Sequence, residues 1–61
     1  MFDKYYNRLM DMTKSDIIRE GITWGVWADN DANRKALMKY TKVLLARKLA
    51  DRLVRLESRG Y

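Results

Sequence analysis

The sequence contains no cysteine and no histidine. Without cysteine the chain can form neither disulfides nor thiolate metal sites, and without histidine it lacks the commonest transition-metal ligand. The usual nucleophile–base pairs are missing too, since Ser15 and Ser58 have no conventional base. The carboxylates are scattered, and no glycine-rich phosphate loop is present. We therefore expect a protein that is not an enzyme, with no cofactor, no metal and no small-molecule substrate.

Proline is absent as well, and only three glycines occur. No Gly/Ser-rich linker and no internal repeat divides the chain, which predicts a single domain over residues 1–61. The longest uninterrupted aliphatic run covers only residues 43–46, far short of a membrane span, and the first residues lack the apolar core of a secretory signal. We expect a soluble, cytoplasmic protein with no membrane partner.

The small size of the chain predicts self-association. A domain of 61 residues buries only about 60% of its unfolded surface, so small domains usually depend on disulfides, a metal or a partner subunit. Since the first two are excluded, a homodimer is expected. The chain also resembles a free-standing small reading frame, and on size alone we expect a phage- or mobile-element-type modulator of a host factor.

The second half of the chain has a helical pattern over residues 32–58, which corresponds to one helix of about 40 Å. Its apolar residues recur after seven, four and seven positions and form one stripe: Met38, Leu45, Leu49 and Leu56. A heptad register fails, because it places Lys42 and Arg52 in the seam. Residues 37–45 are apolar in nearly all directions, which predicts that this part lies in a core or an interface.

The first half predicts two shorter helices. One covers residues 2–12, with an aromatic pair, Tyr5 and Tyr6, expected to pack in the core. Thr13, or alternatively Ser15, caps the second, which runs to about residue 28. Gly21 and Gly25 in this helix are expected to allow close approach of another helix. A strand over residues 22–27 is the competing interpretation, but no second strand could pair with it.

Residues 29–31 form the turn before the long helix, with Asp31 as the expected cap and Asn30 or Asp29 as alternatives. A calcium loop is excluded, because Arg34 and Tyr40 stand where glycine and glutamate are needed. The expected fold class is all-α. Two short helices pack antiparallel to the long C-terminal helix (about 32–58) and along its apolar stripe, in a homodimeric helical bundle.

Two functions compete. Two Trp, four Tyr and four Met are more than one small core needs, and they are types enriched at protein interfaces. We therefore predict a regulatory or adaptor protein that binds another protein, with a partner or dimer interface at Trp24, Trp27, Leu37, Tyr40 and Leu44.

The distribution of charge supports an alternative function. Residues 1–31 carry a net −2 and residues 32–61 a net +7. A cluster within about 60° of the long helix predicts contacts with nucleic acid or an acidic partner: Arg34, Thr41, Lys48, Arg52, Arg55 and Arg59.

Overall fold

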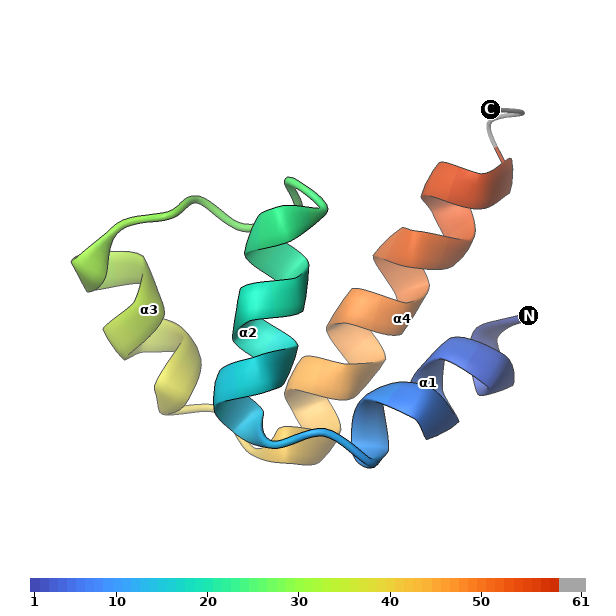
Figure 1. Cartoon of the computed structure of the whole chain (residues 1–61), viewed down its shortest axis with the longest axis horizontal. Helices are drawn as coiled ribbons and strands as arrows, with labels where there is room; N and C mark the ends of the chain where they lie inside the picture. Colours follow the sequence, from blue (N-terminus) through green and yellow to red (C-terminus); the bar gives the residue numbers. More distant parts are fainter. Residues whose placement is uncertain (59–61) are drawn as a thin grey trace.

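The computed structural model describes residues 1–58. They form four helices: α1 (Phe2–Met10), α2 (Lys14–Thr23), α3 (Asp31–Met38) and α4 (Lys42–Ser58) (Figure 1). The helices take up 76% of the described residues, among which there is no strand. The all-α class is therefore confirmed, while the predicted count of three helices is wrong.

The long helix predicted over residues 32–58 is divided into α3 and α4 by a turn at residues 39–41. The Thr41 hydroxyl accepts a hydrogen bond from the backbone N–H of Leu44 at 3.2 Å, so Thr41 starts α4 instead of continuing α3. At the other side of the turn, the Lys14 ammonium donates to the carbonyl of Met38 at 2.6 Å. Threonine competes for backbone hydrogen bonds in this way, and a pattern of apolar residues does not reveal it.

The second helix ends at Thr23 and not near residue 28. Gly25 adopts a φ of +77°, and the N–H groups of Gly25 and Val26 donate to the carbonyls of Ile22 and Gly21 at 3.0 and 2.8 Å. This is the Schellman arrangement that closes a helix through a left-handed glycine. The competing interpretation of a strand over residues 22–27 is wrong as well, since residues 22 and 23 belong to α2 and residues 24–27 form the turn after it.

Gly21 makes room for an aromatic ring and not for another helix. A Cβ at this position would overlap Cε3 of the Trp27 indole, so only glycine lets the ring pack against α2. The chain therefore folds back on α2 directly after its end.

The helix caps agree in part with the predictions. The Thr13 side chain accepts from the Asp16 N–H at 3.1 Å, which confirms Thr13 as the cap of α2. Asn30, the alternative to Asp31, caps α3 by accepting from the Asn33 N–H at 2.7 Å. Asp31 is instead the first residue of the helix, where its negative charge suits the helix dipole.

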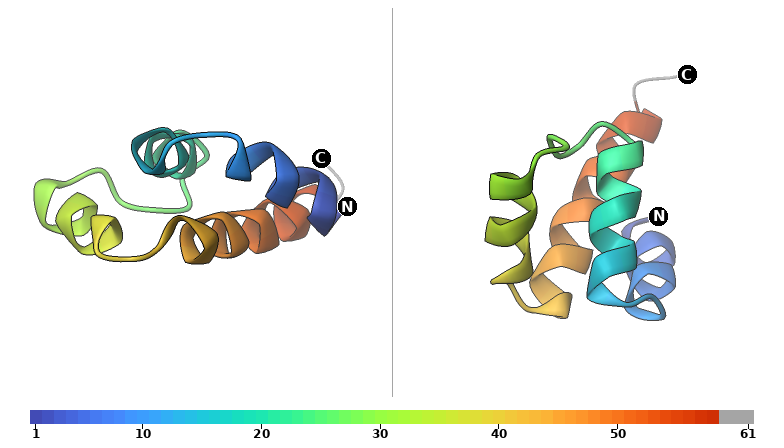
Figure 2. Two further views of the ribbon diagram at one scale, coloured as in Figure 1. Left: turned by 90° about the horizontal axis from the view of Figure 1, so that it is seen from below. Right: turned by 60° about the vertical axis from the view of Figure 1, so that its left-hand side comes forward.

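The helices are arranged in two layers, with α1 and α2 in one and α3 and α4 in the other (Figure 2). Figures 1 and 2 show that α1 runs opposite to α4, whereas α2 runs in the same direction as α4. The expectation that both short helices are antiparallel to the long one is therefore wrong for α2. Each connection reverses the chain, and the additional helix α3 adds one reversal between α2 and α4.

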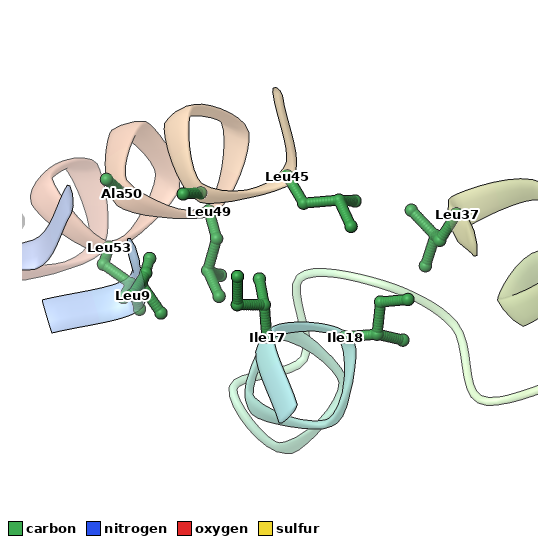
Figure 3. Close-up of a cluster of buried hydrophobic side chains, with 9 residues drawn as sticks. Leu9, Ile17, Ile18, Leu37, Leu45, Leu49, Ala50 and Leu53 are labelled. Atoms are coloured by element: carbon green, nitrogen blue, oxygen red, sulfur yellow. The ribbon is translucent and has the colours of Figure 1, made fainter. Parts of the chain in front are cut away.

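The core lies where α4 meets α1 and α2, and it extends to α3 through a single leucine (Figure 3). Its members are Leu9, Ile17, Ile18, Leu37, Leu45, Ala46, Leu49, Ala50 and Leu53. The predicted stripe is confirmed at Leu45 and Leu49, which are fully buried, but Met38 is exposed because α3 ends there. Tyr5 and Tyr6 pack against the core as predicted.

Within residues 1–58, no helix combines the length and the apolar character needed to cross a membrane.

Candidate binding surface

One side of α4 faces away from the core and carries exposed side chains at helical spacing. Leu44, Lys48, Arg52 and Arg55 fall within an arc of about 80° around the axis of α4, and all four are exposed. We refer to these four residues as the α4 stripe. It begins with an apolar residue and continues with three cations, so the two halves of the stripe suit different groups on a ligand.

Large apolar side chains gather at the turn between α3 and α4. Met38, Tyr40, Val43 and Leu44 are each 41–45% exposed, and we refer to them as the α3–α4 corner. The ammonium of Lys48 lies 5.5 Å from the centroid of the Tyr40 ring, within the range of a cation–π interaction. Tyr40 and Leu44 thus join the corner to the α4 stripe.

The loop that follows α2 lies beside the other end of the stripe. Together they line a groove of about 220 Å³, the Trp24 groove, whose residues are Trp24, Gly25, Val26, Arg52, Arg55 and Leu56. Trp24 is 51% exposed, and its Nε1 donates to Glu20 Oε1 at 3.1 Å. The same oxygen accepts from the Arg8 guanidinium at 2.9 Å. A contact between α1 and α2 therefore sets the orientation of this indole.

Trp27 lies next to the same arginines, but it is partly buried and packs against the core. An adjoining groove of about 310 Å³ is lined by Trp27, Lys48, Asp51, Arg52 and Arg55. Asp51 pairs with the Arg55 guanidinium at 3.4 Å, whereas Arg52 forms no ion pair with any residue of 1–58. Among the described residues the surface therefore keeps a net positive charge, and the Arg52 guanidinium stays outside its ion pairs.

The structure brings most of the predicted site residues onto this one surface. Two sets that the sequence assigned to different functions are adjacent: the aromatic and apolar residues Trp24, Trp27, Tyr40 and Leu44, and the cations Lys48, Arg52 and Arg55. The position of Trp24 beside the arginines depends on the packing of α2 against α4, and that of Trp27 depends on the Gly25 turn. Sequence periodicity shows neither. Met38 and Val43 were not predicted as surface residues, and the Thr41 cap is the sequence signal that could have shown the break.

Two predicted site residues do not belong to this surface. Leu37 is a core residue that faces Ile18, so its predicted place in an interface is wrong (Figure 3). Arg34 lies in a separate groove of about 550 Å³ between α2 and α3 and pairs with Asp29 at 2.8 Å. The predicted cluster assumed one continuous helix, and the turn at residues 39–41 removes Arg34 from its line. Arg59 lies outside the described residues.

A hydrogen bond at a distance from the α4 stripe fastens α1 to the end of α4. The hydroxyl of Tyr5 donates to the Glu57 carboxylate. This bond, followed by burial and the negative charge of Glu57, raises the pKa of Tyr5 above the ordinary tyrosine value. The neutral phenol is therefore the form that the fold favours.

The arrangement as a whole offers contacts for binding: apolar side chains at one end, guanidinium groups at the other and an oriented indole beside them. Within residues 1–58, no group of three or more acidic side chains is placed to hold a metal ion. Comparisons with protein-family models, with curated proteins and with solved structures found no match.

Proposed function

We propose that this protein is a small, non-enzymatic regulatory or adaptor protein that docks on another protein through the α3–α4 corner and the adjoining α4 stripe. The observation that carries the proposal is the exposure of four large apolar side chains at one corner, Met38, Tyr40, Val43 and Leu44. An apolar patch on a small monomer, rimmed by polar residues, is typical of a protein interaction site. Aromatic residues, Met and Arg are also the types enriched at such interfaces.

The magnitudes indicate what kind of partner fits. Complete burial of a leucine side chain contributes about 1.5–3 kcal/mol, so covering the exposed part of four apolar residues contributes about 4 kcal/mol. A micromolar complex needs about 8 kcal/mol after the costs of association. The corner alone is therefore too small, and the cations of the α4 stripe must also be matched. The proposed partner is therefore a protein with an acidic surface and an apolar anchor residue. If this chain is a phage-type modulator, that partner is a host protein.

The homodimer expected from the sequence would use the same corner. Tyr40 and Leu44 are exposed there, whereas Leu37 is buried within a single chain. One corner cannot serve a second copy and another protein at once, so the oligomeric state decides between them. Light scattering at micromolar concentration measures this directly: a dimer that Leu44→Asp dissociates assigns the corner to self-association, and a folded 7.3 kDa monomer leaves it free for another protein.

A capture experiment with matched variants tests docking on another protein. The wild-type chain, Leu44→Asp and Asn7→Asp are immobilised and exposed to the same protein extract. Asn7 is exposed on α1, so its substitution changes the net charge equally but lies away from the corner. The proposal requires a captured protein that Leu44→Asp loses and Asn7→Asp retains. Equal capture by both variants would rule out the corner as the docking surface.

Binding of nucleic acid is the second candidate, and one observation favours it. Lys48, Arg52 and Arg55 lie on one side of α4 and share grooves with Trp24 and Trp27. A gel-shift assay with duplex and single-stranded DNA and RNA, at about 50 and 200 mM salt, tests this candidate, since phosphate contacts weaken steeply as the salt concentration rises. No shift at the lower concentration would remove it.

A further inference from the structure

We infer that the Trp24 groove binds single-stranded nucleic acid, with an unpaired base stacked on the Trp24 indole and a neighbouring phosphate held by Arg52 and Arg55. This inference makes the second candidate function specific, and it does not depend on docking at the α3–α4 corner. It rests on the exposure and orientation of the indole, on the ion pairing of the two guanidinium groups and on the size of the groove between them.

The indole of Trp24 is exposed, oriented and already satisfied at its polar atom. Its Nε1 donates to Glu20, which also accepts from Arg8, so the bond that orients the ring is supported by a third side chain. Trp24 as a residue is 51% exposed, so part of its indole, a ring with a flat π face, remains for a ligand. Stacking on such a face suits any nucleic-acid base, because every base has a π face of its own.

Gly25 keeps the groove beside the indole open. Apart from its chain neighbours, no heavy atom in residues 1–58 lies within 4 Å of where a Cβ of Gly25 would be. Trp24 ends α2 in a helical conformation (φ −78°, ψ −4°), so α2 itself places the indole at the side of α4, and the positive φ of Gly25 redirects only the chain that follows. Gly25 thus leaves the space next to the ring free of a side chain.

The two arginines supply the charge that a phosphate needs. Arg52 forms no ion pair with the described part of the chain, and Arg55 is held by Asp51 at 3.4 Å. A guanidinium group is planar and presents several N–H donors in a fixed geometry, which suits bidentate contact with phosphate oxygens. Lys48 continues the positive charge along the α4 stripe, in the direction that a flexible strand could follow.

The dimensions favour a single strand over a duplex. The groove has a volume of about 220 Å³ and lies between one loop and one helix. In a duplex the bases are stacked on each other and their faces are covered, so only an unpaired base can lie against Trp24. An acidic peptide could neutralise the arginines, but a carboxylate side chain offers no π face to the indole.

The test measures the fluorescence anisotropy of labelled oligonucleotides of about ten nucleotides, oligo-dT and oligo-U, with a duplex of equal length and an oligo-glutamate peptide alongside. We expect the single strands to bind more tightly than the duplex and the peptide. Trp24→Ala should weaken binding about fivefold to a hundredfold, and Trp24→Phe should retain most of it. If circular dichroism shows that Trp24→Ala does not fold, Trp24→Leu replaces it as an apolar side chain without a π face.

Two arginines on opposite sides of α4 provide a matched pair for the charge. Arg52→Glu removes a groove cation, whereas Arg47→Glu makes the same charge change at an exposed position outside both grooves. We expect Arg52→Glu to weaken binding strongly and to reduce the slope of log affinity against log salt by about 0.7, the value for one phosphate contact on a single strand. Arg47→Glu should leave the slope nearly unchanged.

Each contrary result has a distinct meaning. Equal binding of duplex and single strand, unaffected by Trp24→Ala, would overturn the inference and leave a nucleic-acid binder that uses charge alone. Tighter binding of the oligo-glutamate peptide would assign the groove to an acidic protein partner. No binding of any oligonucleotide at about 50 mM salt would overturn both the inference and the second candidate function.

Discussion

Leu44 and Leu45 are identical neighbours in α4, yet one is 43% exposed and the other is fully buried. Replacing each by alanine gives the same change in composition and in helix propensity at adjacent positions. Any difference in stability between Leu44→Ala and Leu45→Ala therefore measures packing alone. This comparison tests directly whether the Leu45 side of α4 faces the core and the Leu44 side faces solvent.

The expected losses in the free energy of unfolding differ several-fold between the two variants. Leu45→Ala removes buried methyl groups and leaves a cavity, which costs about 2–5 kcal/mol. A domain of this size has about 3–9 kcal/mol of stability in total, so this substitution should bring the chain close to unfolding. Leu44→Ala leaves no cavity, because its side chain borders solvent, and we expect a loss of about 1 kcal/mol or less.

Urea denaturation and thermal melting, followed by far-ultraviolet circular dichroism, measure both variants. A difference of about 2–3 kcal/mol corresponds to melting temperatures that differ by roughly 10–20 °C in a domain of this size. An equal loss in both variants, independent of protein concentration, would refute the exposed position of Leu44. A large loss at Leu44 that disappears on dilution would instead indicate that a second copy of the chain covers it.

Two further predictions concern positions outside the α4 stripe. Gly21→Ala should destabilise the protein by up to about 2 kcal/mol, because the added Cβ must displace the Trp27 ring. Alanine also gains about 1 kcal/mol of helix propensity over glycine, which offsets only part of that strain. Thermal melting measures the loss, and an unchanged or raised melting temperature would contradict the packing of Trp27 on α2. The raised pKa of Tyr5 means that its neutral form stabilises the fold, so this contribution is complete below pH of about 10 and is lost as the pH rises through the folded-state pKa. Urea denaturation at several pH values above about 9 should show this decline in the wild type and a smaller one in Tyr5→Phe, and identical declines would argue against the bond to Glu57.

The sequence alone determined the fold class, the start of α2 and much of the core. Leu45 and Leu49 recur at helical spacing, and a helix with one apolar stripe must bury it, so their place in the core follows from periodicity. The cap at Thr13 could be predicted because its side-chain oxygen and the N–H that it binds are only three residues apart, so the contact depends on local sequence alone. The aromatic and basic residues of the candidate surface could likewise be named from their types.

Only the tertiary structure decided where the long segment breaks and which residues share the surface. Residues 32–58 can be read as one helix, and breaking it at residues 39–41 loses helical hydrogen bonds, but the break lets Leu37 pack on Ile18 while Leu45 remains in the core. That exchange depends on contacts between elements distant in sequence, which no local pattern contains. The sequence likewise could not show that Trp24 would lie beside Arg52 and Arg55, because their proximity arises from the packing of α2 against α4.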